Sequence, residues 1–328
     1  MKRLLVPAFI VCMLVVSCVE NSTPVPARED APFSTPVVLP TQTVAALAAA
    51  PALHPTATEK PRQFSPIIPA PTRTTTPTSA PSTSDVEASA WKELPILPET
   101  IDASLQRVYE RGITLGNDPH AFSIFGDCQA RPGEFFGVFE TDADLIASLS
   151  PDLQETVDYF SGSFSRESPT AQDGTTPGSL LWTQWHRGEY GCTFAETPVQ
   201  CELRVHRPSF VIIQIGTHFE SRNTEYLRRV ILQLLDAGVV PILATKADNR
   251  EKDERINRDM AMLAAEYDLP LWNFWAAVSH LPNRGLYTRD DRPLQGDIYL
   301  TEEATVIHRL SGLTALDAVW RAVAGPPE

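Results

Sequence analysis

The sequence predicts an α/β fold, a three-layer α/β/α sandwich with a parallel sheet of about five strands. Short apolar runs recur between residues 121 and 274, and segments with helical spacing of apolar residues separate them. Every glycine of the chain lies at or after Gly112, so the folded part is confined to the later residues. Runs that are apolar on both faces suit buried parallel strands, and strand–helix alternation suits a sheet covered on both sides.

Four apolar runs of strand length are the expected strands, at 121–125, 209–215, 239–244 and 269–274, with 159–165 as a weaker candidate. Apolar residues at helical spacing predict helices over 227–235 and 256–267. A last helix is expected to start at Thr301, where Glu302 and Glu303 suit its positive end. Its expected buried residues are Val306, Leu310, Leu313, Leu316 and Trp320.

Residues 1–18 read as a lipoprotein signal peptide. Lys2 and Arg3 precede an apolar run over residues 4–16, which is shorter than the about 20 residues that span a bilayer. The Val15-Val16-Ser17-Cys18 stretch that follows resembles the lipobox of bacterial lipoproteins. The resemblance implies cleavage before Cys18 and a lipid anchor on that residue. The alternative is an ordinary secretory signal that contains a cysteine.

Residues 19–90 are rich in Pro, Thr, Ala and Ser and contain neither glycine nor tryptophan. Such a segment cannot bury enough apolar surface to fold, so we expect a disordered, semi-rigid linker. The folded domain is expected over 91–328. Together these segments predict an extracytoplasmic protein held on a bacterial membrane by its N-terminal lipid.

The charge of the chain argues against a nucleic-acid partner. Residues 1–88 hold six basic and six acidic side chains, so the whole net charge of −14 falls on the remaining 240 residues. An acidic domain without a Lys/Arg cluster suits neither phosphate backbones nor anionic lipid surfaces. The sequence also lacks a glycine-rich dinucleotide or nucleotide motif, a nucleophile elbow and metal-site spacing of His or Cys. No cofactor and no metal are therefore expected.

Three cysteines remain after the signal segment. Outside the cytoplasm, Cys192 and Cys201 are expected to form a disulfide that closes the loop between them. The alternatives are two surface thiols, or a bridge from one of them to Cys128.

Polar residues follow the expected strands: Gly126-Asp127-Cys128, Gly216-Thr217-His218 and Lys246 to Asn249. In an open parallel sheet, ligands bind beyond the carboxyl ends of the strands. Over roughly residues 105–320 the order and spacing of these blocks resemble the SGNH/GDSL hydrolase family. That resemblance implies a serine nucleophile in a G-D-S block, an oxyanion-binding asparagine in G-x-N, and a histidine base before the last helix.

The match is partial. Cys128 stands where the family has serine, His218 stands where it has asparagine, and Tyr299 falls where the histidine is expected, with Asp297 nearby. The glycine of the second block is Gly174, with Gly178 as the alternative. Tyrosine has a pKa near 10 and cannot replace histidine as an ordinary base, so the inherited triad is broken.

Two interpretations of Cys128 and His218 stay open. In the first they form a Cys–His dyad, with His218 as base and the Cys128 amide as an oxyanion donor, and with Asp127 or Asp297 orienting the site. In the second, Cys128 is a small buried thiol and His218 is a satisfied polar residue.

Further residues are weaker candidates. Lys246, Asp248 and Asn249 are candidate substrate-binding residues or a turn that caps a helix. Arg166, Glu167 and Ser168 are candidate lining residues of the same site. Trp182 and Trp185, beside His186, are a candidate pair for stacking on a sugar. Trp272 and Trp275 are expected in the core, and His308 is expected to be structural.

Three functions follow from this sequence. The first is a membrane-anchored ester hydrolase or acyl transferase acting on acylated envelope carbohydrate. The second is a catalytically silent relative that binds carbohydrate or another envelope component through the same cleft. The third is a tethered structural lipoprotein with a vestigial cleft. The retained Gly126-Asp127 and Gly216-Thr217 pairs favour a maintained cleft, while Cys128 and Tyr299 favour silence.

Overall fold

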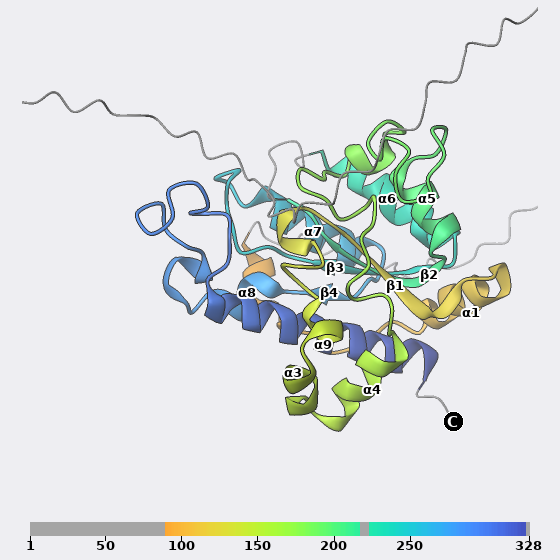
Figure 1. Cartoon of the computed structure of the whole chain (residues 1–328), viewed down its shortest axis with the longest axis horizontal. Helices are drawn as coiled ribbons and strands as arrows, with labels where there is room; N and C mark the ends of the chain where they lie inside the picture. Colours follow the sequence, from red (N-terminus) through yellow and green to blue (C-terminus); the bar gives the residue numbers. More distant parts are fainter. Residues whose placement is uncertain (1–88, 217–222, 326–328) are drawn as a thin grey trace, which may run out of the picture. The chain divides into compact units, whose positions relative to one another are not determined.

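The computed structural model describes residues 89–216 and 223–325. In these residues four strands form one parallel sheet in the order β1-β2-β3-β4 (Figure 1). The first three apolar runs therefore form strands, as predicted, whereas in the fourth, 269–274, only Leu271 and Trp272 are in a strand and Phe274 begins the next helix. The strands are β1 (Asp118–Gly126), β2 (Pro208–Gln214), β3 (Val240–Ala244) and β4 (Leu271–Trp272).

A fifth neighbour of the sheet is reduced to an isolated parallel bridge between Gly126 and Ala171. The Gly126 N–H donates to the Thr170 carbonyl (2.9 Å), and the Thr170 hydroxyl donates to the Ile124 carbonyl (2.9 Å). Because β2 already occupies one edge of β1, Ala171 lies at the other edge. The sheet thus consists of four strands and one residue in place of a fifth.

The weaker candidate strand, 159–165, is wrong. The helix α4 (Pro151–Tyr159) takes the first of these residues, and turns and bends follow it. Phe160 and Phe164 both pack edge-on against Phe122 of β1. Both rings thus enter the core from the turns that follow α4, which is why the segment is apolar without being a strand.

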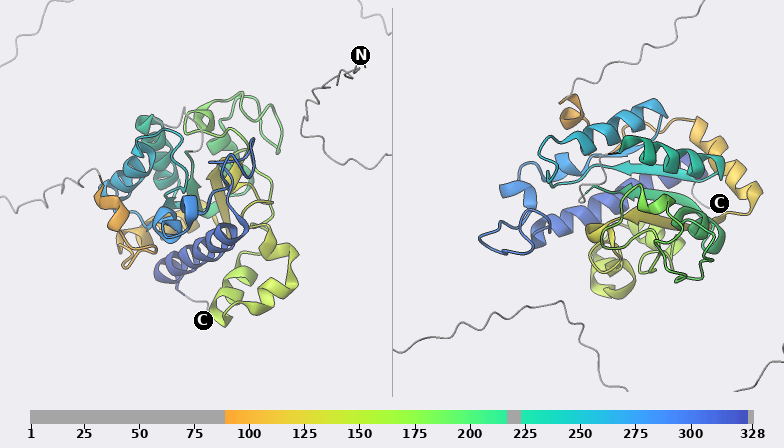
Figure 2. Two further views of the ribbon diagram at one scale, coloured as in Figure 1. Left: turned by 90° about the vertical axis from the view of Figure 1, so that its left-hand side faces the viewer. Right: turned by 90° about the horizontal axis from the view of Figure 1, so that it is seen from above.

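Helices cover both faces of the sheet, which confirms the layered α/β class (Figure 2). The pair α6 (Thr224–Asp236) and α7 (Arg255–Glu266) packs on one face. The long α9 (Glu302–Ala324) packs on the other with α4 and α8 (Phe274–Val278). The predicted helices at 227–235, at 256–267 and after Thr301 are therefore confirmed. Shorter helices are α1 (Ser104–Leu115), α2 (Val138–Thr141), α3 (Ala143–Ser148) and α5 (Pro198–Val205).

Single 3-10 turns complete the described elements: η1 (Ala90–Glu93), η2 (Cys128–Ala130), η3 (Ser179–Leu181) and η5 (Pro282–Gly285). The core lies on both faces of the central strands, and all seven residues of β2 are buried. That burial explains why the strand is apolar without alternation.

The prediction for the buried face of α9 is right except at one residue. Leu313, Leu316 and Trp320 are buried and Leu310 is half-buried, whereas the Val306 side chain is 52% exposed. The buried stripe of the helix begins at Ala304, and a residue two positions on points about 200° away around a helix.

The predicted disulfide is confirmed. Cys192 and Cys201 are bonded, with their Cα atoms 5.2 Å apart, and Cys128 is a buried free thiol. In the described part of the chain, the longest helices are too short or too polar to cross a membrane. Residues 1–88, with Cys18 and nearly all of the predicted linker, lie outside the described residues.

Candidate functional site

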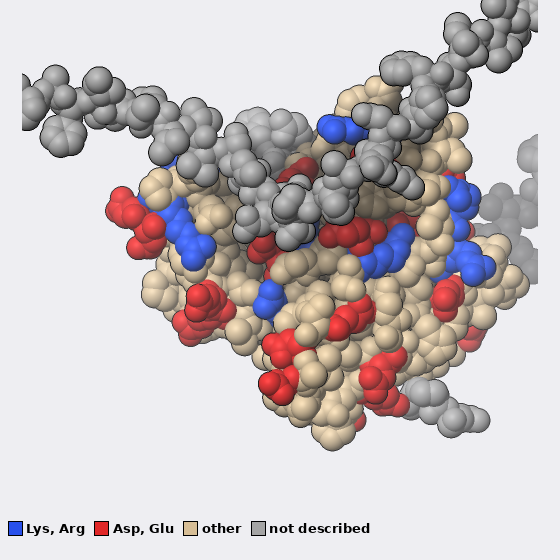
Figure 3. All heavy atoms as spheres, viewed as in Figure 1, with Lys and Arg blue, Asp and Glu red and all other residues tan. Residues whose placement is uncertain are grey.

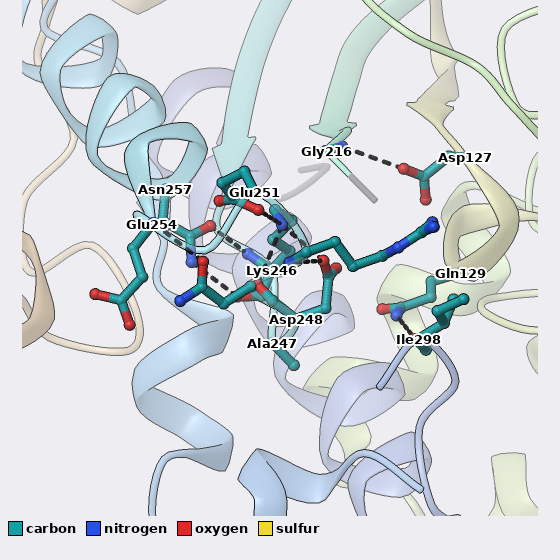
Figure 4. Close-up of polar contacts among 12 residues, drawn as sticks. Asp127, Gln129, Gly216, Lys246, Ala247, Asp248, Glu251, Glu254, Asn257 and Ile298 are labelled. Carbon is teal, nitrogen blue, oxygen red and sulfur yellow. Dashed lines mark hydrogen bonds and ion pairs between the residues drawn. The ribbon is translucent and has the colours of Figure 1, made fainter. Parts of the chain in front are cut away.

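The carboxyl ends of the four strands lie in one row. The parallel register pairs Gly126 with Gln214, and Ala244 with Trp272, and Ile213 with Leu243 between them. Residues at or beyond this row come from five separate parts of the sequence, and polar contacts join several of them (Figure 4). We call this group the strand-end site; it comprises Gly126–Cys128, Ala171–Gly174, Gly216, Thr245–Asn249 and Asp297–Tyr299.

The end of β1 is the point where the sheet changes direction. The chain leaves β1, returns to one edge of it at Ala171, and then crosses to its other edge as β2. Ligand sites of open α/β sheets form at such a switch point, because the connections diverge there and leave space. The Gly126-Asp127-Cys128 block therefore occupies the expected position for a functional site.

Asp127 joins the first and third blocks of the predicted site. Its Oδ2 atom accepts a hydrogen bond from the Gly216 N–H (3.1 Å), and the carboxylate is almost fully buried. Thr217 and His218, which follow Gly216, lie outside the described residues. The structure therefore brings the first and third blocks together up to Gly216.

Cys128 is the buried thiol at the centre of the site. The residue is 6% exposed, and its Sγ lies 4.0 Å from Oδ1 of Asp127, to which the thiol donates. The pKa of Cys128 is raised to about 12, first by burial and then by the carboxylates of Asp127, Asp173 and Asp248. At pH 7 only about one such thiol in 10⁵ is ionised.

Tyr299, at the position expected for the family histidine, lies near enough to Cys128 for their charges to interact. The pKa of Tyr299 is raised to about 12, first by burial and then by the Cys128 thiolate and the carboxylates of Asp173 and Glu134. The segment is tied to the end of β1, because the Gln129 side-chain amide donates to the Ile298 carbonyl. Both Cys128 and Tyr299 are therefore protonated near neutral pH.

Asp297 points into a different set of contacts. Its carboxylate accepts from Nε of Arg289 (3.0 Å) and from the Asn283 amide (3.4 Å), and its backbone has a left-handed φ of +63°. Both partners lie in the loop between α8 and α9. In the described residues, none of these contacts joins Asp297 to Cys128.

Lys246 forms a buried ion cluster. Its Nζ donates to Oδ1 of Asp248 (2.7 Å) and to Oε2 of Glu251 (2.7 Å), and its side chain is only 4% exposed. The Lys246 backbone is also held at both N–H and carbonyl by the Asn257 side chain (2.8 and 2.9 Å). The ammonium group is thus neutralised inside the protein and fixes the loop after β3. Glu251 and Asn257 were missed in the sequence, where nothing but proximity to Lys246 marks them.

Asn249, the last of the candidates after β3, closes the same loop. Its side-chain oxygen accepts from the Glu254 N–H (3.1 Å), which is the turn contact proposed as the alternative to ligand binding.

Two glycines of the blocks are required by close packing. A Cβ atom on Gly126 would lie 2.1 Å from the Ala130 Cβ, and one on Gly216 would lie 2.8 Å from Cδ and Cε of Lys246. The glycines that define the first and third blocks thus allow η2 and Lys246 to approach the strand ends.

Gly174, the candidate second-block glycine, follows the bridge at Ala171 and has a φ of +83°. A Cβ there would contact the Trp185 ring at 3.5 Å. The alternative, Gly178, would instead meet the Tyr226 ring at 3.2 Å. The neighbouring Asp173 pairs with Arg131 (3.0 Å) and acts on the pKa of Cys128, so the Gly174 segment is the one that borders the thiol.

A polar pocket of about 260 Å³ adjoins this segment. It contains both tryptophans of the predicted sugar-stacking pair; Trp182 is 53% exposed and Trp185 is half-buried. Two buried donors of the lining, Nε2 of Gln172 and Nε1 of Trp185, have no hydrogen-bond partner among the described residues. The lining residues are Gln172, Asp173, Trp182, Gln184, Trp185, Arg187 and Glu189.

Three other candidate lining residues, Arg166, Ser168 and His186, form hydrogen bonds within the protein. Arg166 pairs with the buried carboxylate of Glu202, and Ser168 donates to the same carboxylate (3.0 Å). His186 is buried, with Nε2 bonded to the Glu196 carbonyl (2.8 Å). Arg166 and Ser168 therefore hold Glu202 of α5, whereas Glu167 is exposed.

His308 lies in the core beneath the strand ends. Its ring stacks on Phe135 and Trp272, and Nε2 donates to Oε1 of Gln214 (2.7 Å). Burial lowers the pKa of His308 to about 3, so the ring is neutral near pH 7. Within residues 89–216 and 223–325, no group of His, Cys, Asp and Glu side chains has an arrangement that would hold a metal ion.

Comparisons with known proteins give only a weak structural similarity. No protein-family model matches the chain, and no curated protein matches its sequence. Among solved structures, the chain is similar to a proposed acylhydrolase from Bacteroides fragilis, with 14% sequence identity. The similarity covers 69% of this chain and 100% of that one, with a TM-score of 0.38. At this level of similarity we infer nothing about activity, and the α/β class stands on the parallel sheet and its two helical layers.

Proposed function

We propose that this chain is a membrane-tethered, extracytoplasmic protein whose SGNH/GDSL-like domain binds envelope carbohydrate at the strand-end site, without a working thiol nucleophile. The observation that carries this proposal is the environment of Cys128: a buried thiol among Asp127, Asp173 and Asp248, with its pKa raised to about 12. Nucleophilic catalysis by cysteine needs the thiolate, which negative neighbours and burial both disfavour.

The residue at the position expected for the histidine base, Tyr299, favours ligand binding over hydrolysis. Tyr299 stands where the resemblance calls for a histidine, and its pKa of about 12 keeps its proton on the phenol. A general base works best with a pKa near the operating pH. Tyr299 instead offers a neutral phenolic hydrogen, which suits hydrogen bonding to a ligand.

The tryptophan pocket supports carbohydrate as the ligand. Trp182 exposes a large apolar face, while Gln172, Gln184 and Asp173 supply donors and acceptors beside it. A sugar presents apolar C–H faces together with hydroxyl groups, and a pocket with aromatic walls and a few polar side chains matches both. A hydroxyl oxygen bound there would also accept from the unpaired Gln172 and Trp185 donors.

The tether in this proposal comes from the sequence. The lipobox-like residues end at Cys18, and a Pro/Thr-rich segment separates them from the domain. Membrane labelling with a radioactive fatty acid tests the anchor: Cys18→Ala is expected to abolish labelling and to release the protein from the membrane fraction. Labelling that persists in Cys18→Ala would rule the anchor out.

Glycan binding tests the central part of the proposal. We expect Trp182→Ala to weaken binding of envelope-derived oligosaccharides at least tenfold by titration calorimetry, and Cys128→Ala to keep it within about twofold. Phe194→Ala is the matched control, because that exposed ring lies outside the pocket lining. Unchanged affinity in Trp182→Ala, or no binding by the wild type, would reject carbohydrate binding at this pocket.

The second candidate function is ester hydrolysis by a Cys–His dyad. It is favoured by the hydrogen bond from Gly216 to Asp127, because His218 follows Gly216 by only two residues. Hydrolysis of p-nitrophenyl acetate and acetylated sugars between pH 6 and 9 distinguishes the two. Activity that disappears in both Cys128→Ala and His218→Ala would establish the hydrolase, while equal background rates in all three proteins would favour the binding function.

A further inference from the structure

A second polar pocket, of about 480 Å³, borders the strand-end site on the side of β3. It lies between the loop that follows β3 and the loop between α8 and α9. Basic and acidic side chains both reach the surface over the latter loop, at the left of Figure 3. The lining residues are Asn249, Arg250, Lys252, Arg284, Leu286, Arg289 and Asp297.

The charge of this pocket is opposite to that of the chain. Leaving Arg250 aside, three of the lining residues are basic (Lys252, Arg284 and Arg289) and one is acidic (Asp297), whereas the chain carries a net charge of −14. Clustered positive charge is unfavourable by itself and attracts a counter-ion of opposite sign. In a domain with so few basic residues, the concentration of them in one pocket points to an anionic ligand.

Two guanidinium groups are held in position with their ends open. Arg284 donates from Nε to the Ala247 carbonyl (2.9 Å), and Arg289 donates from Nε to the Asp297 carboxylate (3.0 Å). Within the described residues, the terminal amino groups of both side chains have no hydrogen-bond partner, and the Lys252 ammonium has none either. Such ends match the two oxygens of a carboxylate or phosphate group.

The backbone around the pocket is unusual at three lining residues. Lys252, Arg284 and Asp297 have left-handed φ angles of +70°, +53° and +63°, which non-glycine residues rarely adopt. These conformations persist only where the surrounding structure holds them, and they cluster at ligand sites. Here they direct three charged side chains of two loops to one pocket.

From these observations we propose that this pocket binds the carboxylate or phosphate group of a soluble ligand, with Arg284 as the principal contact and Lys252 and Arg289 at its side. The ammonium and guanidinium groups supply charge and fixed donors, and Asn249 supplies an amide whose oxygen is already held by the Glu254 N–H. The site is separate from the tryptophan pocket and does not depend on sugar binding there.

The test is titration of the full-length chain, in non-ionic detergent, with inorganic phosphate, glucuronate, glycerol phosphate and uncharged glucose. We expect the anions to bind, glucose to show no binding at this pocket, and added salt to weaken the affinity. A stronger response to glucuronate identifies a carboxylate ligand, and a stronger response to glycerol phosphate identifies a phosphate ester; both support the pocket.

Variants localise the binding. Arg284→Gln is expected to lower the affinity at least tenfold and Lys252→Gln about threefold, while Arg107→Gln, an exposed arginine on α1, leaves it unchanged. Lys252 is exposed, so its variant remains informative if Arg284→Gln fails to fold. Trp182→Ala should also leave phosphate affinity unchanged, which separates this site from the tryptophan pocket. Equal affinities in wild type and Lys252→Gln, or no binding of any of the three anions, would overturn the proposal.

Discussion

The backbone N–H of Gly216 donates to Oδ2 of Asp127 across 3.1 Å, which joins the residue after β2 to the residue after β1. Through its other oxygen, the same carboxylate accepts the thiol hydrogen of Cys128 at 4.0 Å. One side chain therefore both fixes the strand ends and places a negative charge beside the thiol. In this setting Asp127 acts against ionisation of the residue that follows it.

Asp127→Asn is expected to lower the pKa of Cys128, because the negative charge of Asp127 is one of the causes that raise it. Burial is the larger cause and is unchanged, so the pKa should stay above the ordinary value for cysteine. The pH dependence of iodoacetamide alkylation measures this shift. Asp144→Asn, on the exposed surface of α3, is the control, and an equal profile in both variants would show that Asp127 does not act on the thiol.

Lys246→Met is expected to destabilise the domain by roughly 3–5 kcal/mol, since it leaves the buried carboxylates of Asp248 and Glu251 without their common partner. Urea unfolding followed by tryptophan fluorescence measures the loss. Lys252→Met is the control, at an exposed residue of the same loop, and should change the free energy of unfolding by less than about 0.5 kcal/mol. Similar losses in the two variants would contradict a structural role for the Lys246 cluster.

Gly216→Ala is expected to cost about 1–3 kcal/mol, because the new methyl group would lie 2.6 Å from Cγ2 of Ile256 and 2.8 Å from the Lys246 stem. The stem cannot move aside without breaking the ion cluster. Gly133→Ala provides a matched control, since a Cβ at Gly133 meets no atom within 4 Å. A neutral effect at Gly216 would mean that the strand ends are less tightly packed than described.

The stability of the domain should fall in mild acid because of His308. Its folded-state pKa of about 3 lies below the unfolded value of about 6.5, so the unfolded chain binds the extra proton between these two values. The stabilisation is complete above pH 6.5 and declines as the pH falls, by roughly 2 kcal/mol at pH 5. His308→Gln should flatten this part of the stability profile, whereas His280→Gln, at an exposed residue, should leave its slope unchanged.

Reduction of the Cys192–Cys201 disulfide is expected to lower stability by roughly 2.5–3 kcal/mol, because the bond closes a loop of nine residues in the unfolded chain. Denaturation in the presence and absence of a phosphine reductant measures the difference. The folded structure need not change, so circular dichroism should be the same in both conditions. A midpoint that does not move would show that the loop is held by other contacts, such as the pair between Glu196 and Arg204.

The fold was largely predictable from the sequence, because buried parallel strands leave unbroken apolar runs. The segment 159–165 was misjudged because Phe160 and Phe164 are as apolar as strand residues. The structure places this segment at the end of α4 and in the turns that follow, with both rings packed on Phe122. Val306 was wrongly predicted as buried. The spacing of apolar residues predicts a buried side of the helix, but the elements packed against the helix decide which side that is, and here the buried residues begin at Ala304.

The candidate site was predictable only in part. The blocks at Gly126 and Gly216 were predictable because each directly follows an apolar strand run, and the structure shows that close packing requires glycine at both positions. The charge around Cys128 was not predictable, since Asp173 reaches the thiol from a segment 45 residues away in the sequence. The neutralisation of Lys246 by Glu251 was likewise hidden, because a charged residue near a strand end reads equally well as a ligand or as an internal ion pair.

The most direct test of this account is the alkylation rate of Cys128 as a function of pH, in a chain that begins at residue 19 and so retains Cys128 as its one cysteine outside the disulfide. With a pKa raised to about 12, the rate should keep rising through pH 10 without a plateau, and p-nitrophenyl acetate should be hydrolysed no faster than by Cys128→Ala. A plateau below pH 8, together with hydrolysis that Cys128→Ala abolishes, would instead show an active thiolate and contradict the proposed binding function.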